Sequence, residues 1–338
     1  MQASAAPLLL VLDGNSLLYR AYHAAATGQL LDRDDRPVWA IKGLVGYLAR
    51  AAARLRPDAV LVGFDCVDDS ARKADYPGYK AQRPDKPADL AEQIADAPGL
   101  LGDAGVGTVR PDGYEADDVL ASSAAAARRV GWRSVLMTSD RDAFALIDAT
   151  TSVLRVRNGG FEQAVLVTPE SLAEVYGVAP AQYPDYAALR GDPSDNLRGV
   201  PGFGSATAAR LLAAFGSLDT AWAAWDRGER DAVRSAIGDR AADSFGAPLA
   251  REVVARNRRL MAMRADLAVP DPDSVRLPLD LAVMKRALAG RGIILGPSLW
   301  ALTGGSPPAD TALIPQQWTW RRSVRSRREP MPGQLALF

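Results

Sequence analysis

The stretch LLLVLD, residues 8–13, places a carboxylate directly after five consecutive apolar residues. A continuous apolar run of this length is typical of a strand that is buried on both faces. The pattern recurs where the apolar run Ala59 to Phe64 ends at Asp65, and where Ser134 to Met137 is followed by Asp140. We therefore predict three strands whose ends carry acidic residues.

Helical patterns separate these predicted strands. Apolar residues recur at helical spacing from Ile41 to Leu55, and an alanine-rich helix is expected from Glu115 to Val130. This alternation indicates an α/β domain with a mainly parallel sheet, and such sheets bind ligands beyond the carboxyl ends of their strands. Val153 to Val156 and Ala164 to Val167 flank an Asn-Gly-Gly turn, which predicts an edge hairpin.

The domain organisation follows from where these patterns change. We predict an α/β core over residues 1–168 and a mostly helical region over 169–300, with a glycine-rich turn at Gly199 to Gly204. Residues 301–338 are rich in proline and arginine, a composition that favours a flexible tail.

The composition restricts the chemistry. The 338 residues are 48% apolar and 24% charged with a formal net charge of zero, which is typical of a soluble globular protein. Cys66 and His23 are the only residues of their kinds, which excludes an intrachain disulfide, multi-thiolate zinc sites and Ser-His or Cys-His catalysis. No apolar run could span a bilayer and the N-terminus lacks a basic leader, so we expect a cytoplasmic protein without a membrane partner.

Five short motifs gather acidic residues. They are LDGNSLLYRAYHA with Asp13, GFD with Asp65, GYEADDVL with Glu115, Asp117 and Asp118, TSDRDAF with Asp140 and Asp142, and GDPSDN with Asp192 and Asp195. Each is weak alone, because a single aspartate after a strand is more often a helix cap or a turn former. Three of the motifs fall at corresponding strand ends, so folding should collect their carboxylates in one crevice.

Collected carboxylates repel one another, and bound divalent cations would relieve that repulsion. Two unit charges in contact repel by roughly 1 to 4 kcal/mol, depending on the effective dielectric constant. Oxygen-only ligands favour Mg²⁺ or Mn²⁺ over Zn²⁺, and two such ions can support attack of water on a phosphate. The pattern thus indicates a metal-dependent phosphodiesterase.

In this order, the five motifs resemble those of the 5′-nuclease family, which includes flap endonucleases and the N-terminal nuclease domain of bacterial DNA polymerase I. The resemblance covers roughly residues 8 to 300 and implies a PIN-like fold with a helical arch and a helix-hairpin-helix region. It also implies two or more Mg²⁺ or Mn²⁺ ions, held by Asp13, Asp65, Glu115, Asp117, Asp118, Asp140, Asp142, Asp192 and Asp195.

A basic segment with interleaved tyrosines lies within residues 66–100. It includes YKAQR, residues 79–83, and could simply be a mobile, solvated loop. The resemblance implies that it is the arch through which a single-stranded 5′ end passes, with Lys80 and Arg83 stabilising charge on the scissile phosphate and Arg72 contacting DNA. Arg20 resembles a further phosphate contact of the family.

GVPGFGSATAARLL, residues 199–212, resembles the helix-hairpin-helix element of the family, which we place at about residues 186–216. Glycines at a helix start let backbone amides approach a phosphate without reading sequence. The resemblance implies DNA contacts at Gly202, Gly204 and Ser205 and a K⁺ site in this loop. Many relatives have a Glu-Lys pair where this chain has Ser205 and Ala206.

The chain ends in QLALF. Gln334, Leu335, Leu337 and Phe338 resemble the peptide that docks bacterial replication proteins on the sliding clamp. A chance apolar terminus is the alternative.

These observations predict a monomeric, nucleoid-associated 5′-3′ exonuclease and flap endonuclease for primer removal and DNA repair. Its substrates would be DNA with 5′ flaps, nicks or single-strand/double-strand junctions. Two alternatives remain: a catalytically silent scaffold that tethers branched DNA to the clamp, and a metal-dependent hydrolase of RNA or phosphate esters.

Overall fold

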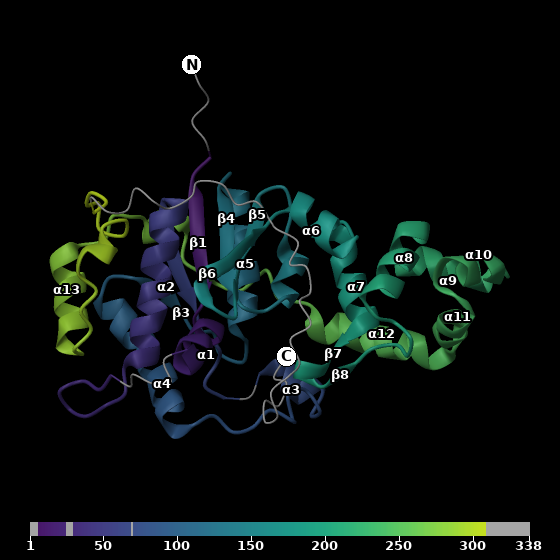
Figure 1. The fold of residues 1–338 in the computed structure, drawn as a ribbon, viewed down its shortest axis with the longest axis horizontal. Helices are drawn as coiled ribbons and strands as arrows, with labels where there is room; N and C mark the ends of the chain where they lie inside the picture. Colours follow the sequence, from purple (N-terminus) through teal and green to yellow (C-terminus); the bar gives the residue numbers. More distant parts are fainter. Residues whose placement is uncertain (1–5, 25–29, 69, 309–338) are drawn as a thin grey trace, which may run out of the picture. The chain divides into compact units, whose positions relative to one another are not determined.

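The computed structural model describes residues 6–24, 30–68 and 70–308, which form two compact units (Figure 1). Among these residues, the first unit contains those up to 71, 85–169 and those from 263 onward. The second contains 72–84 and 170–262. The predicted domain ranges follow sequence order, whereas each unit is assembled from separated stretches.

The first unit is built on a six-stranded sheet with the order β3-β2-β1-β4-β5-β6. The strands are β1 Leu8–Asp13, β2 Ala59–Gly63, β3 Gly107–Val109, β4 Arg133–Thr138, β5 Thr151–Arg157 and β6 Gly160–Val167. All neighbours are parallel except β5 and β6, which form an antiparallel edge hairpin. The predicted mainly parallel sheet is confirmed, and the hairpin forms as expected. The short strand β3 was not predicted, because three residues carry no periodic signal.

Strand register brings the acidic residues to one edge of this sheet. Asp13 pairs with Gly63 of β2, and Leu12 pairs with Met137 of β4. Every residue of β1 and β2 is buried, as their continuous apolar runs require. The carboxyl ends of three adjacent strands, β2, β1 and β4, therefore open at the same edge.

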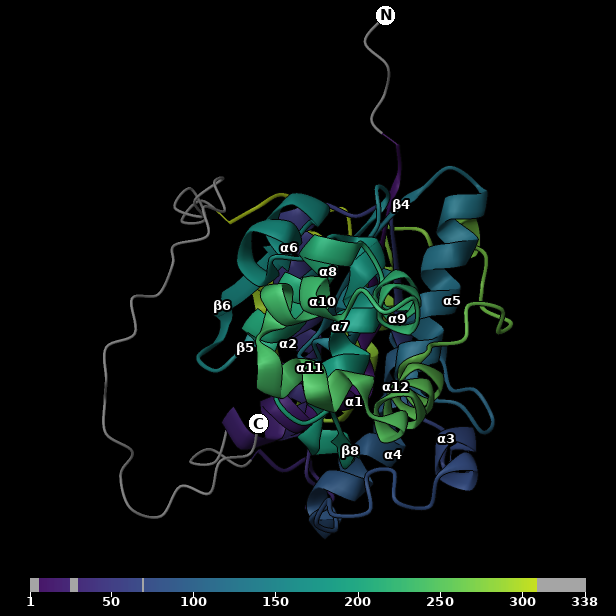
Figure 2. The same cartoon turned by 90° about the vertical axis from the view of Figure 1, so that its right-hand side faces the viewer.

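Helices cover both faces of the sheet. They are α1 Gly14–Ala24, α2 Trp39–Leu55, α4 Ala88–Asp103, α5 Ala116–Arg129 and α13 Leu281–Gly290, with the short helices η1 Asp142–Leu146, η4 Pro272–Val275 and η5 Gly296–Leu299. The chain crosses from β1 to β2 in one direction and from β3 to β4 in the other. Right-handed crossovers then put α5 and α2 on opposite faces, as Figure 2 shows.

The predicted arch, residues 66–100, is divided between the units. Helix α4 packs on α1, α2 and β3 in the first unit and buries Leu90, Leu100 and Leu101. Residues 72–84 belong to the second unit.

The second unit is mostly helical, as predicted for the region that follows the sheet. Its helices are α3 Ala71–Asp75, α6 Pro169–Tyr176, η2 Pro180–Gln182, α7 Tyr183–Arg190, η3 Pro193–Asp195, α8 Ser205–Phe215, α9 Leu218–Asp226, α10 Arg230–Ile237, α11 Asp239–Gly246 and α12 Pro248–Met261. Two short strands, β7 Gly191–Asp192 and β8 Leu197–Arg198, pair antiparallel around η3. Among the described residues, no helix combines the length and apolar character that a membrane crossing requires.

Candidate active site

Asp13 is the most deeply buried of the three carboxylates at the strand ends, with 5% of its surface exposed. Its Oδ1 accepts the backbone N–H of Ser16 at 2.9 Å and its Oδ2 accepts the Thr138 hydroxyl at 2.7 Å. Burial first, and then the neighbouring charges of Asp65 and Asp140, raise the pKa of Asp13 to about 7. Asp65 and Asp140 are thus close enough to Asp13 for their charges to disfavour its ionisation.

Asp65 follows β2 and is oriented by two neutral donors. Its Oδ1 accepts the backbone N–H of Ala116 at 2.9 Å, and its Oδ2 accepts the side-chain amide of Asn15 at 2.7 Å. The Asn15 side chain also accepts the backbone N–H of Asp65. Burial, and then Asp65 and Glu115, raise the pKa of the neighbouring Cys66 thiol.

Asp140 and Asp142 are arranged by the turn that follows β4. The backbone N–H of Asp140 donates to Thr138 Oγ1 at 3.1 Å, and its Oδ1 accepts the N–H of Asp142 at 2.9 Å. Thr138 therefore links Asp13 and Asp140 through one hydroxyl.

The EADD motif forms the start of α5. Glu115 is the N-cap residue, and its backbone N–H donates to Asp118 Oδ2 at 3.0 Å. Asp118 has no exposed surface, and its other oxygen accepts the backbone N–H of Arg264 at 2.8 Å. Asp118 thus fixes the helix start as well as the chain at Arg264, while the preceding residue, Asp117, is half-buried.

The remaining two predicted ligands lie in the second unit, on the turn between β7 and β8. Asp192 caps η3, with Oδ1 accepting the backbone N–H and the hydroxyl of Ser194 at 2.7 Å. Asp195 is 6% exposed, and its Oδ1 lies 2.5 Å from Nη2 of Arg83. We call residues 191–196 the acidic turn.

The YKAQR segment packs directly on the acidic turn, within the same unit. The backbone N–H of Lys80 donates to the Asp195 carbonyl at 3.0 Å, and Asn196 Nδ2 donates to the Gly78 carbonyl at 2.8 Å. The Tyr79 ring is buried against Leu197 and Leu260. Two predicted DNA contacts therefore rest on the loop that holds predicted metal ligands.

The other predicted DNA-contacting arginines make structural contacts. Arg72 donates to the carbonyls of Leu260 and Ala262 at 2.9 and 3.0 Å, where α12 ends. In the first unit, Arg20 Nη1 donates to Asn158 Oδ1 at 3.0 Å, and burial lowers the pKa of Arg20. These contacts hold both guanidinium groups in place.

The glycine-rich turn before α8 has an open surface. Gly204 is the helix N-cap, and a Cβ placed there would meet nothing within 4 Å. Gly202 has a φ of +84°. In contrast, a Cβ on Gly199 would lie 2.2 Å from the Arg190 carbonyl oxygen, so only glycine fits there. Ser205 is exposed as the first residue of α8.

Around the strand ends, sequence reasoning nominated the acidic residues and missed the neutral residues that orient them. Asn15 and Thr138 orient the strand-end carboxylates but were only quoted within the motifs. The available signal was a polar residue adjacent to each strand end. Gln334, Leu335, Leu337 and Phe338 lie outside the described residues.

Two family models match the chain that carries this acidic sheet edge. The chain belongs to the 5′-3′ exonuclease family: its N-terminal resolvase-like domain matches residues 8–177, and its C-terminal SAM fold matches residues 178–278.

Curated relatives are bacterial DNA polymerases I. The protein of Mycobacterium bovis is 38% identical over 274 residues, which cover 81% of this chain and 29% of the polymerase. The thermostable enzyme of Thermus thermophilus is 34% identical over 330 residues, which cover 97% of this chain and 37% of the polymerase. The chain thus spans about a third of the length of these relatives.

Solved structures share the fold at low identity. The T5 D15 protein crystallised with metal ions has a TM-score of 0.59 and 18% identity, over 88% of this chain and 97% of its own. The catalytic core of Rad2 in complex with DNA has a TM-score of 0.54 and 16% identity, over 88% of this chain and 92% of its own.

Proposed function

We propose that this chain is a divalent-metal-dependent 5′-3′ exonuclease and flap endonuclease that acts on branched or nicked DNA. One observation carries the proposal: Asp13, Asp65 and Asp140 meet at one sheet edge and accept bonds from neutral donors. Within the part of the chain that the structure describes, none of these three carboxylates is in an ion pair. Their negative charge is therefore left for a ligand.

The donor set fits Mg²⁺ or Mn²⁺. The three groups offer only carboxylate oxygens, which hard divalent cations prefer. Burial first, and then the charges of Asp65 and Asp140, raise the pKa of Asp13, and a bound cation would favour its charged form. When bound, such ions would activate water and offset charge on the phosphate. Glu115, Asp117, Asp118 and Asp142, with Asp192 and Asp195 of the second unit, are proposed as the other ligands.

The basic groups would hold the DNA. Lys80 and Arg83 are proposed to stabilise charge on the scissile phosphate. Arg20 and Arg72 would contact the backbone, and Gly202, Gly204 and Ser205 would present backbone amides to one duplex strand. A K⁺ ion in the same loop is part of the proposal.

A 5′-labelled flap substrate with Mn²⁺ tests the activity. Wild-type protein should release the flap, chelation should stop cleavage, and Asp117→Asn and Asp140→Asn should abolish cleavage while DNA binding persists. Undiminished cutting by both variants would contradict the proposal. Binding without cutting by the wild type would favour the scaffold, and faster turnover of hairpin RNA or a simple phosphate ester would favour the other alternative.

The cellular role is a separate part of the proposal. We infer primer removal and repair near the nucleoid, with QLALF docking on a sliding clamp as an apolar peptide. Removal of residues 334–338 should abolish binding to immobilised clamp and leave flap cleavage without clamp unchanged. Equal clamp binding by the truncated chain would contradict the docking.

A further inference from the structure

A second helical hairpin lies beside the glycine-rich turn in the second unit. Helix α10 ends at Ile237, Gly238 turns the chain with a φ of +84°, and α11 begins at Asp239. A Cβ on Gly202 would lie 3.5 Å from Ala241 Cα, so the glycine-rich turn packs on the start of α11. The two hairpins therefore pack against each other.

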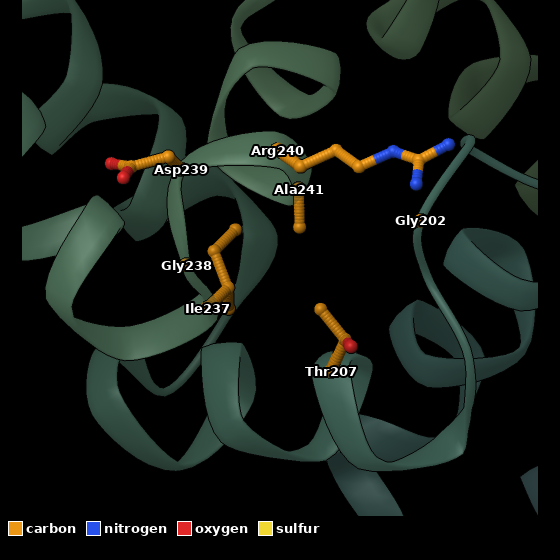
Figure 3. A pocket seen from close by; sticks show the side chains of 7 residues that line it. All are labelled: Gly202, Thr207, Ile237, Gly238, Asp239, Arg240 and Ala241. Carbon is orange, nitrogen blue, oxygen red and sulfur yellow. The ribbon is translucent and has the colours of Figure 1, made fainter.

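A pocket of about 530 Å³ opens between these hairpins. Figure 3 shows it between the Gly202 backbone, the side chain of Thr207 from α8, and the first turn of α11. Arg240 extends along one side of the pocket toward Gly202 (Figure 3). The pocket is thus lined by a hydroxyl and a guanidinium.

The charge balance of the pocket favours an anion. The carboxylate of Asp239 points away from the gap in Figure 3 and lies 3.2 Å from Arg234 Nη1. Within the described chain, neither the Arg240 guanidinium nor the Thr207 hydroxyl makes a hydrogen bond or an ion pair. Arg240 therefore carries the unneutralised charge of the lining.

The first turn of α11 adds backbone donors to the same pocket. Its N-cap is Gly238, which supplies no side-chain acceptor for the first N–H groups of the helix. The first N–H groups of a helix without such an acceptor can donate to an anion. These N–H groups would add to the positive charge that Arg240 brings to the pocket.

We propose that this pocket binds a backbone phosphate of duplex DNA adjacent to the phosphate held by the glycine-rich turn, with Arg240 as its main contact. The inference rests on the proposed function, and it lengthens the duplex-binding surface from one hairpin to two. Arg240 and Thr207 contribute charge and a hydroxyl, so the contact is independent of base sequence.

The test measures binding of a fluorescent flap duplex in the absence of divalent ions, over a series of salt concentrations. Each neutralised phosphate contributes about −0.9 to the slope of log K against log salt, so Arg240→Gln should make that slope less negative by about 0.9. Affinity near 0.1 M salt should fall about three- to tenfold. Thr207→Val should lower affinity about two- to fivefold with an unchanged slope, since it removes no charge.

Arg230→Gln is the matched control. Arg230 is exposed, belongs to the same unit and stacks over the Trp225 ring at 5.3 Å. Arg230 begins α10, whereas the pocket lies at the other end of that helix. The helix is about 12 Å long, which exceeds the Debye length of about 10 Å at 0.1 M salt, so the charge of Arg230 is largely screened from the pocket. Its variant should keep the wild-type slope. Equal slopes for wild type and Arg240→Gln would overturn the pocket assignment and leave the nuclease proposal intact, whereas no duplex binding by the wild type would overturn both.

Discussion

Two groups of acidic residues in this molecule are held in opposite ways. In the first unit, Asp13, Asp65 and Asp140 accept hydrogen bonds from backbone amides, a hydroxyl and a side-chain amide. In the second unit, Asp195 accepts a hydrogen bond from the guanidinium of Arg83 and forms an ion pair with it. Neutral donors orient a carboxylate and leave its charge, whereas a guanidinium neutralises it. The strand-end group, Asp13, Asp65 and Asp140, therefore keeps its charge for a metal ion. Asp195 would have to give up the guanidinium of Arg83 before it could bind one.

Asp32 shows that the environment, and not the residue type, sets this difference. Burial alone would raise its pKa, but backbone N–H bonds from Arg36 and Asp34 and the side chain of Arg291 outweigh burial and hold the pKa at about 2. Asp13, in the same unit, has a pKa of about 7. Residue type alone cannot predict this difference, because only the folded chain brings each aspartate together with its hydrogen-bond partners.

The largest effect is expected when the strand-end group loses a charge. Asp65→Asn should lower Mn²⁺ affinity by more than about a hundredfold, since even residues behind the ligands change metal affinity by about ten- to a hundredfold. Calorimetric Mn²⁺ titration of the DNA-free protein measures this. Asp103→Asn, an exposed aspartate of the same unit, should bind Mn²⁺ like the wild type. A wild-type affinity for Asp65→Asn would remove the strand-end group from the metal site.

Removal of one neutral donor tests whether orientation matters. Thr138→Val deletes the hydroxyl that contacts Asp13 and Asp140, so we expect Mn²⁺ affinity and flap cleavage to fall about ten- to a hundredfold. Thr138→Ser keeps the hydroxyl and should retain most of both. Equal losses in the two variants would point to side-chain shape and packing at position 138, which both variants change, instead of hydrogen bonding.

Sequence patterns predicted the fold well where one signal dominated. The buried run of residues 8–12 determines a central strand, and the Asn-Gly-Gly turn determines the β5-β6 hairpin. They failed at β3, whose residues are half-buried and too few to show a period. The grouping of residues 72–84 with the acidic turn depends on long-range contacts, such as Lys80 to Asp195, which no local pattern contains.

The same limit applies to the candidate site. The carboxylates could be nominated because acidic residues after apolar runs are visible in sequence. Their partners could not, because Asn15 and Thr138 act on residues 50 and 125 positions away. The ion pair of Arg83 with Asp195, 112 positions apart, is equally invisible.

A smaller effect is expected at the acidic turn. Arg83→Gln removes the cation that competes for Asp195, so Mn²⁺ affinity should rise about 1.4- to fivefold, which corresponds to the roughly 0.2 to 1 kcal/mol of a partly exposed ion pair. Flap cleavage should nevertheless fall if Arg83 contacts the scissile phosphate. Arg128→Gln, which breaks the ion pair with Asp148 in the first unit, should change neither quantity. Lower Mn²⁺ affinity in Arg83→Gln would show that the arginine supports the metal site instead of competing with it.

The smallest effect on metal binding is expected at Asp32, whose charge is already neutralised. Asp32 Oδ2 lies 2.6 Å from Arg291 Nε and 3.1 Å from Arg36 Nη2, so Asp32→Asn should leave Mn²⁺ affinity unchanged but lower the free energy of unfolding at pH 7. Because its folded pKa of about 2 lies below the ordinary 3.8, this stabilisation is present above pH 3.8 and is lost as pH falls toward 2. Urea unfolding between pH 7 and pH 3 should show the difference between wild type and variant shrinking in acid. Asp34→Asn, whose side chain is 76% exposed, is the control and should show a much smaller difference. A difference that stays constant down to pH 3 would mean that Asp32 stabilises the fold through packing, without its charge.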